Sequence, residues 1–241
     1  MDRVSRLKPV LFLVLLVASK LSFANPETPY VVGVFEGIER EIAVAEGELV
    51  GRFSPYYECV FSRVEGNFRF VEMPLAQILY QLDKGGIAAG LPLVQTSRRD
   101  EYADFGGLLF QTEYVYLLVE DLPPLDSLIG LRYGFVRRFV GDQLLRGEDP
   151  SVTHVSDWGQ AVEMLIRGRV DVVVLPWVLV DYYMDGFEGD YYERTAAWVD
   201  LSLYISHEGA STNLTNQIRR SVRECRFISE KKPLGADGMG L

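Results

Sequence analysis

The chain has 241 residues, with 24 lysines and arginines against 34 aspartates and glutamates, and a formal net charge of −10 at pH 7. Such an acidic surface repels nucleic acid and anionic lipid, so neither is an expected partner. The two histidines, His154 and His207, are far apart in the sequence and have no cysteine nearby. We therefore expect neither a metal site nor a cofactor.

The first 24 residues have the pattern of a cleavable signal peptide. A basic start is followed by the apolar run Val10–Ala18 and by the small-x-small sequence Ser22-Phe23-Ala24. The run is too short to span a bilayer, although Lys20 departs from the pattern and leaves a retained N-terminal anchor as the alternative. Without this leader the chain keeps 20 basic and 33 acidic residues, a net charge of −13. We expect a soluble, exported protein that begins at Asn25.

Strand and helix signals alternate along the first half of the mature chain. Strands are expected at Tyr30–Phe35, Phe68–Glu72 and Ile87–Leu91, with a polar connection at Glu36–Glu48. Helices are expected from Ser54-Pro55 to Arg63 and from Pro74 to Gly85. Thr96 is expected to cap a short basic turn that contains Arg98 and Arg99. Cations in the first turn of a helix oppose the helix dipole, so these arginines are either neutralised by nearby acids or kept for binding.

The second half has the same alternation. Strands are expected at Glu113–Glu120, Leu131–Val136, Val170–Leu175 and Trp198–Ile205. Helices are expected at Val140–Leu145, Asp157–Arg167 and Asn213–Cys225. Gln160 is placed to complete a capping box with Ser156-Asp157, and the continuous apolar run Val170–Leu175 is typical of a buried parallel strand.

An internal repeat indicates the architecture. The pattern Leu79-x-x-Leu82-x-Lys84-Gly85-x-Ile87 recurs as Val162-x-x-Leu165-x-Arg167-Gly168-x-Val170. Each copy is a helix, a glycine stop and a buried strand. We predict two α/β lobes of similar plan, with the chain passing from one to the other near residues 110–119. A single doubly wound domain is the alternative.

The order of these segments resembles the periplasmic solute-binding proteins of family 3, which include amino-acid receptors of ABC importers. The similarity rests on four elements: the helix-glycine-strand unit, Thr96-x-x-Arg99-x-x-x-x-Asp104-Phe105, Leu125-Asp126-Ser127-Leu128-x-Gly130-x-x-Tyr133-Gly134-Phe135, and Gly168-Arg169-Val170-Asp171. The resemblance implies a type II periplasmic binding fold, with two α/β lobes joined by two crossing segments and a ligand held between them.

The resemblance also implies boundaries. Lobe one would contain residues 25–112 and 204–230, lobe two residues 113–203, and residues 231–241 would form a flexible tail. The second crossing would fall near Trp198–Ser206 and return the last helix to lobe one. Export favours a disulfide between Cys59 and Cys225, and this topology brings the two together; two buried thiols are the alternative.

Several positions depart from the amino-acid receptors that the chain resembles. Val94 stands where those receptors have a hydroxyl residue, Ala88 where they have an aspartate, and Pro176 where an acidic residue holds the ligand ammonium. Arg99 matches the arginine that holds the ligand carboxylate. The resemblance with these departures implies an anionic ligand that lacks an ammonium group beside its carboxylate.

The expected function is therefore an exported, periplasmic binding protein, a monomer, that closes on a small anionic ligand for an ABC permease or a membrane sensor. The expected ligand-binding residues are Arg99, Thr96, Arg137, Arg138, Trp177, Tyr56 and Glu36. An enzyme on the same fold, similar to cyclohexadienyl or arogenate dehydratases, is a second hypothesis, with Glu36, Glu39 and Asp181 as candidate acids. A family member with a decayed pocket is the third.

Overall fold

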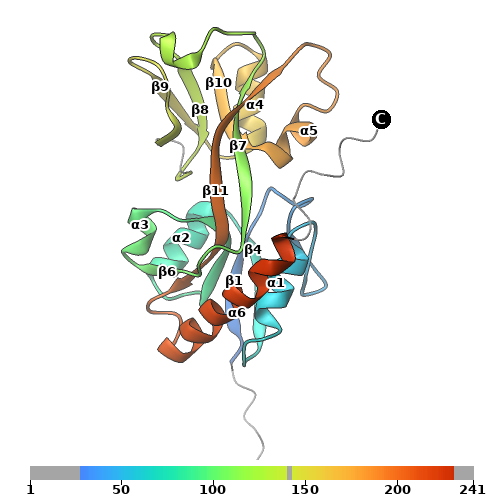
Figure 1. Cartoon of the computed structure of the whole chain (residues 1–241), viewed down its shortest axis with the longest axis vertical. Helices are drawn as coiled ribbons and strands as arrows, with labels where there is room; N and C mark the ends of the chain where they lie inside the picture. Colours follow the sequence, from blue (N-terminus) through green and yellow to red (C-terminus); the bar gives the residue numbers. More distant parts are fainter. Residues whose placement is uncertain (1–27, 140–142, 231–241) are drawn as a thin grey trace, which may run out of the picture.

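The structure is a computed structural model that describes residues 28–139 and 143–230 (Figure 1). The expected signal peptide, the expected tail and the start of the helix expected at Val140–Leu145 lie outside the described residues. Within the described part of the chain, no helix is both long and apolar enough to cross a membrane.

Lobe one is the lower lobe in Figure 1 and is built around a parallel sheet. Its elements are β1 (Tyr30–Phe35), β2 (Ala43–Ala45), β3 (Glu48–Val50), α1 (Ser54–Phe61), β4 (Phe68–Met73), α2 (Leu75–Asp83), β5 (Ala89–Val94), α3 (Ser97–Asp100), β6 (Ala103–Phe105) and α6 (Thr212–Glu230). Strand β1 lies between β4 and β5 and is parallel to both. The apolar face of α2 packs Ile78 and Leu82, both fully buried, into the core of this lobe.

Lobe two repeats the plan on a smaller scale. Its elements are the short helix η1 (Leu125–Ser127), β8 (Arg132–Val136), β9 (Ser151–Val155), α4 (Trp158–Ile166), β10 (Val172–Pro176), the short helix η3 (Trp177–Leu179) and α5 (Val180–Tyr183). Strand β8 is parallel to both β9 and β10. The repeat seen in the sequence therefore corresponds to α2–β5 in lobe one and α4–β10 in lobe two.

Two long antiparallel strands, β7 (Phe110–Leu118) and β11 (Tyr192–Ser206), run from one lobe into the other (Figure 1). Strand β11 pairs with β5 in lobe one and with β7 along its other part, and β7 pairs with β10 in lobe two. One sheet with the order β4-β1-β5-β11-β7-β10-β8-β9 thus passes through both lobes. The predicted crossing near residues 110–119 is confirmed.

Some local predictions were wrong. The connection Glu36–Glu48 contains β2, which pairs with β3 in a small hairpin. Strand β5 begins at Ala89 rather than at Ile87. Strand β9 was not predicted, because four of its five side chains are exposed or half-buried and mostly polar. The buried parallel strand predicted at Val170–Leu175 is present as β10, which begins at Val172; it is parallel to β8 and also pairs with β7 in antiparallel.

The start of α4 has the predicted capping box. Asp157 Oδ1 accepts from the backbone N–H of Gln160 at 2.9 Å, and Gln160 Oε1 accepts from the N–H of Ser156 at 3.1 Å. Both side chains thus satisfy backbone donors that the helix itself cannot.

We expect Asp157→Ala to lower the free energy of unfolding by about 1 kcal/mol, because the first turn of α4 loses its cap. Urea denaturation followed by circular dichroism measures this change, with Asp185→Ala, at an exposed position, as the control. Equal midpoints for the two variants would show that the cap contributes nothing.

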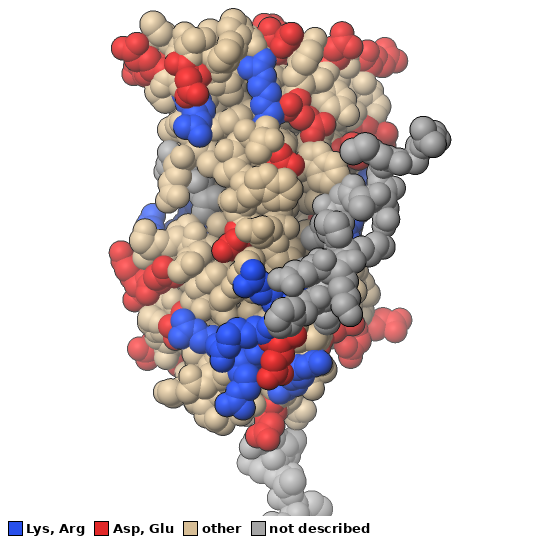
Figure 2. All heavy atoms as spheres, in the orientation of Figure 1, with Lys and Arg blue, Asp and Glu red and all other residues tan. Residues whose placement is uncertain are grey.

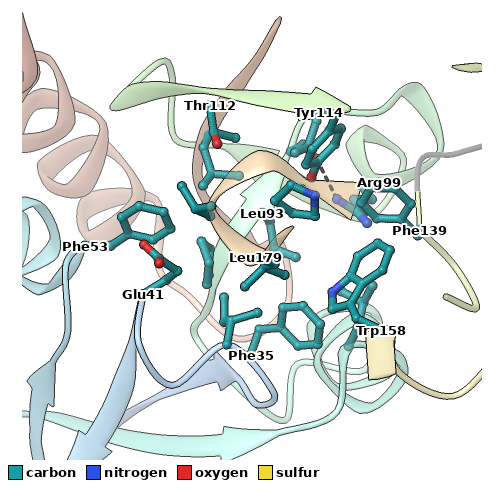
Figure 3. Close-up of a pocket in the computed structure, with 17 residues that line it drawn as sticks. Phe35, Glu41, Phe53, Leu93, Arg99, Thr112, Tyr114, Phe139, Trp158 and Leu179 are labelled. Carbon is teal, nitrogen blue, oxygen red and sulfur yellow. Dashed lines mark hydrogen bonds between the residues drawn. The ribbon is translucent and has the colours of Figure 1, made fainter. Parts of the chain in front are cut away.

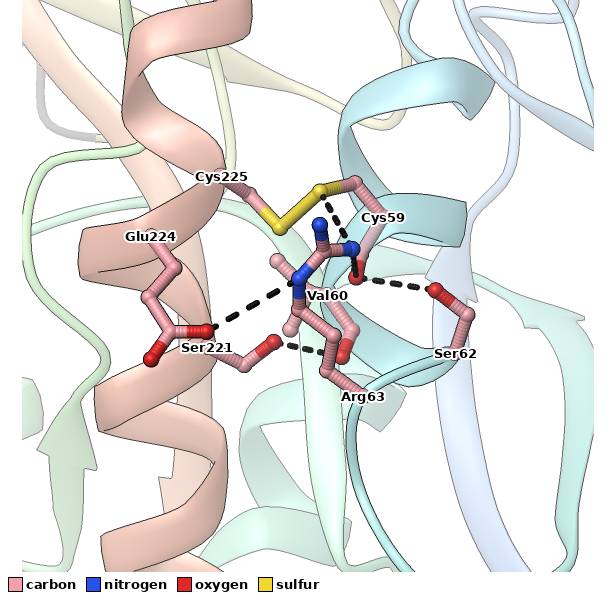
Figure 4. Close-up of a disulfide and its surroundings, with 7 residues drawn as sticks. All are labelled: Cys59, Val60, Ser62, Arg63, Ser221, Glu224 and Cys225. Carbon is pink, nitrogen blue, oxygen red and sulfur yellow. Dashed lines mark hydrogen bonds and ion pairs between the residues drawn. A yellow bond between two sulfur atoms is a disulfide. The ribbon is translucent and has the colours of Figure 1, made fainter.

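The predicted disulfide is present. Cys59 on α1 and Cys225 on α6 are joined, with their Cα atoms 5.9 Å apart (Figure 4). Ser221 Oγ also donates to the carbonyl of Val60 at 2.7 Å, so the two helices are held by a second contact. The last helix is therefore fastened to lobe one.

Acidic side chains surround much of the molecule, and basic ones gather over the lower part of lobe one (Figure 2). The exposed arginines Arg220 and Arg223 lie on α6. Arg63 pairs with Glu224 at 3.8 Å on the same side. On the face shown in Figure 2, basic side chains therefore gather over α6.

Candidate functional site

A small, partly open cavity of about 60 Å³ lies between the lobes (Figure 3). Its lining comes from both lobes and from the crossing strands: Phe35, Ile38, Glu41, Phe53, Leu75, Pro92, Leu93, Val94, Arg99, Thr112, Tyr114, Phe139, Trp158, Pro176, Val178, Leu179 and Leu201. Most of these side chains are apolar. Pockets for small-molecule ligands are commonly about 300–1,000 Å³, so a ligand of more than a few atoms requires the lobes to part.

Arg99 is the cation of this cavity. Its side chain is only 5% exposed, and it forms no ion pair with any described residue. Instead, Nη1 donates to the carbonyl of Val94 at 2.6 Å and Nη2 to the carbonyl of Arg138 at 3.4 Å. Burial lowers the pKa of Arg99, and the nearby Tyr114 is the main opposing influence. A guanidinium nevertheless stays protonated in proteins, so the cavity holds an unneutralised positive charge.

The position of Arg99 is fixed by Tyr204, a fully buried residue of β11. The backbone N–H of Thr96 donates to Tyr204 Oη at 2.9 Å, and Tyr204 Oη is 2.7 Å from Asp100 Oδ1, to which it donates. Thr96 Oγ1 accepts from the N–H of Arg99 at 3.3 Å, as its predicted capping role requires. A crossing strand thus anchors both ends of α3.

Between the described parts of the two lobes, three polar contacts lie around the cavity. One is the hydrogen bond from Arg99 to the carbonyl of Arg138 in lobe two. Tyr183 Oη donates to the carbonyl of Gly37 at 3.4 Å, and the Arg40 guanidinium lies 4.9 Å from the centre of the Tyr182 ring. Together with the apolar cavity lining, these contacts define a closed arrangement.

The cavity also contains a buried carboxylate, that of Glu41, which is 1% exposed. Burial raises the pKa of Glu41, whereas the positive charges of Arg52 and Arg40 act in the opposite direction. Arg52 Nε is 3.6 Å from Glu41 Oε2. Neither carboxylate oxygen has a hydrogen-bond donor among the described residues.

A second, polar groove of about 600 Å³ lies on the other side of Arg99. Residues of both lobes line it: Leu79, Tyr80, Asp83, Thr96, Arg98, Arg99, Glu101, Tyr102, Arg138, Phe139, Gln143 and His154. Arg99 therefore stands in the wall between a small apolar cavity and a larger polar groove. Within the described residues, no cluster of histidine, cysteine or carboxylate side chains could hold a metal ion.

Neither the family models nor the curated proteins contain a match to this sequence. Solved structures do match. The arginine-, lysine-, histidine-binding protein ArtJ from Geobacillus stearothermophilus is 15% identical, with a TM-score of 0.69, over 84% of this chain and 91% of its own. The substrate-binding protein of an amino acid ABC transporter is 14% identical, with a TM-score of 0.67, over 84% and 95%. The VFT2 domain of BvgS from Bordetella pertussis, as a double mutant, is 18% identical, with a TM-score of 0.65, over 84% and 92%.

The chain has the type II periplasmic binding-protein fold. At this level of identity the similarity establishes the fold alone. The matched structures include the substrate-binding protein of an ABC transporter, a binding protein for basic amino acids and the VFT2 domain of BvgS. The same fold therefore occurs in more than one kind of protein.

Within this binding-protein fold, the structure brings some of the predicted site residues together. Arg99 lines both the cavity and the groove, whereas Thr96 and Arg138 line the groove. Arg138 contributes its carbonyl to Arg99, and its side chain is exposed. Val94 and Pro176, where the sequence departs from the amino-acid receptors, both line the cavity.

The other predicted residues lie elsewhere. Tyr56 is a core residue that stacks on Phe110, with ring centres 4.8 Å apart. Trp177 packs against the hydrophobic core and is not part of either lining. Arg137 and Glu36 are exposed and line neither space. The candidate catalytic acids Glu39 and Asp181 are likewise exposed.

The cleft of the binding-protein fold contains residues that the sequence did not single out. They are Glu41, Phe53, Tyr114, Phe139 and Trp158. Phe139 directly follows the predicted Arg137-Arg138 pair, and that proximity is the only sequence signal for any of them. The others reach the cleft only through the packing of distant elements.

Proposed function

We propose that this protein binds a small polar ligand between its lobes and that Arg99 contacts an anionic group of that ligand. The observation that supports the proposal is the burial of Arg99 without an acidic partner among the described residues. A buried charge is costly unless it is paired. A carboxylate that binds the planar guanidinium through two parallel hydrogen bonds would provide that pairing.

The proposed role is that of an exported, monomeric periplasmic receptor that serves an ABC permease or a membrane sensor. ArtJ is described as a binding protein for arginine, lysine and histidine, and the VFT2 domain belongs to BvgS. Both kinds of protein therefore support the binding fold, and neither identifies the ligand of this chain.

The small size of the cavity favours a second candidate, a signalling module that works without a small-molecule ligand. On this hypothesis the apolar lining of the cavity is simply the packed interface of the lobes. An enzyme is less well supported, because the described residues of the lining include no second carboxylate and no histidine beside Glu41.

We expect Arg99→Gln to weaken binding of the ligand at least about tenfold, which corresponds to ~1.4 kcal/mol. A thermal-shift screen of amino acids and short carboxylates on the wild-type protein would identify the probe. A ligand present at about 100 times its Kd adds ~2.7 kcal/mol of stability, roughly 5–10 °C in Tm for a chain of this size.

The control is Arg220→Gln, which removes an exposed arginine of α6 that lines neither the cavity nor the groove. It should retain the stabilisation by the probe. A carboxylate that stabilises Arg99→Gln as much as wild type would refute the role of Arg99. The absence of any shift across the screen would favour the signalling module.

A further inference from the structure

Glu41 is the second unsatisfied charged group of the cavity. Both of its carboxylate oxygens are buried, and neither accepts a hydrogen bond from a described residue. Leaving a buried carboxylate without donors costs more than leaving a neutral group unpaired. Buried polar groups in folded proteins are almost always hydrogen-bonded, so this exception needs an explanation.

Arg52 does not remove the need for a donor. The distance of 3.6 Å between its Nε and Glu41 Oε2 is longer than a hydrogen bond, and the Arg52 side chain is 48% exposed. Meanwhile the backbone of Glu41 is held on both sides. Its N–H donates to the carbonyl of Ile38 at 2.8 Å, and its carbonyl accepts from the N–H of Phe53 at 2.7 Å. The carboxylate therefore remains in the lining and can accept further donors.

Glu41 and Arg99 lie at opposite sides of the cavity (Figure 3). Glu41 is next to Phe53, Arg99 is next to Tyr114, and apolar side chains such as Leu93 lie between them. A plain carboxylate would pair with Arg99 and leave Glu41 without a donor. A plain amine would pair with Glu41 and leave Arg99 without an anionic partner. A molecule with both groups at its two ends would satisfy both sides at once.

We propose that the ligand of this site is a short dipolar molecule, with its anionic group on Arg99 and an amine or other proton-donating group on Glu41. This inference rests on the proposed function, since it assumes that Arg99 binds the anion. Among the residues that the structure describes, Glu41 is the only carboxylate in the lining, and it is separated from Arg99. The donor group therefore sits away from the anion, as in an ω-amino acid and unlike the α-ammonium group of an α-amino acid.

The test is isothermal titration calorimetry with matched pairs of probes. The ω-amino acids β-alanine, 4-aminobutanoate and 5-aminopentanoate are compared with propanoate, butanoate and pentanoate. We expect at least one amino acid to bind wild type about tenfold more tightly than the carboxylate of equal length. In Glu41→Gln this preference should fall to about twofold or less, while the affinity for the plain carboxylate is retained.

Two further variants complete the test. Glu48→Gln, at an exposed position of β3, should keep the wild-type preference. Glu41→Asp has a side chain one methylene shorter and should shift the preference toward a longer ω-amino acid, which keeps the test valid if Glu41→Gln does not fold.

The outcomes separate the two proposals. If the paired probes bind wild type equally, or if the preference survives in Glu41→Gln, the inference is wrong while the role of Arg99 stands. If no probe binds wild type, the inference is wrong. If probes bind but Arg99→Gln loses nothing, the proposed function fails as well.

Discussion

Replacing Cys59 and Cys225 together by serine is expected to lower the free energy of unfolding by about 5 kcal/mol. The disulfide closes a loop with a sequence separation of 166 residues, and the chain-entropy estimate grows with the logarithm of that length. Most of the chain, including all of lobe two, lies inside the loop. The unfolded state therefore loses much of its conformational freedom when the bridge is intact.

Urea denaturation of the oxidised wild type, the reduced wild type and the double variant measures this effect. The matched control is Ser221→Ala, which removes the hydrogen bond to Val60 across the same pair of helices and should cost ~1 kcal/mol. Other polar contacts of this region, such as those of Arg63 with Glu224 and with the Cys59 sulfur, are present in that control (Figure 4). A loss below about 2 kcal/mol for the double variant would contradict the loop argument.

The second large effect is expected at Tyr57, which is fully buried between α1 and the crossing strands. Its ring contacts Phe110 of β7, with ring centres 6.1 Å apart, and its hydroxyl donates to the carbonyl of Ser202 on β11 at 2.9 Å. Tyr57→Ala would leave a cavity at the base of both crossing strands. We expect a loss of about 3–5 kcal/mol, as for other large aromatic residues in cores.

Tyr57→Phe separates packing from hydrogen bonding. It keeps the ring and removes only the hydroxyl, so the loss should be ~1–2 kcal/mol from the unpaired Ser202 carbonyl. Chemical denaturation of both variants gives the two values. Equal losses for the alanine and phenylalanine variants would show that ring packing against Phe110 contributes little.

Local patterns allowed much of the fold to be predicted from the sequence. Hydrophobic periodicity placed α2 and α4, and the Ser156-Asp157 capping signal placed the start of α4, since these features depend on neighbours within one turn. The disulfide followed from export and from a topology that returns α6 to lobe one. By contrast, β9 escaped prediction because an exposed edge strand lacks an apolar face.

The candidate site was only partly predictable, because a cleft depends on long-range packing. The spacing that resembles family 3 pointed to Arg99, which lines the cavity, whereas its place at a helix start explains little. Helix α3 has only four residues, too few for a substantial dipole, and its position comes from Tyr204, which is distant in sequence. Glu41 sits in a polar stretch with nothing to mark its burial, and Trp177 and Tyr56 were misplaced because aromatic residues suit cores and binding sites equally.

The pairing of the crossing strands has a consequence for how the chain can diverge. Leu118 at the end of β7 is the direct pairing partner of Tyr192 at the start of β11. The chain therefore leaves the β7–β11 pair at Leu118 and returns to it at the neighbouring Tyr192. The segment between them is an insertion at the end of a β-hairpin. Insertions or deletions within residues 119–191 leave the pairing of Leu118 with Tyr192 unchanged. The strand pairing of lobe one and its disulfide are then retained while the length of lobe two changes.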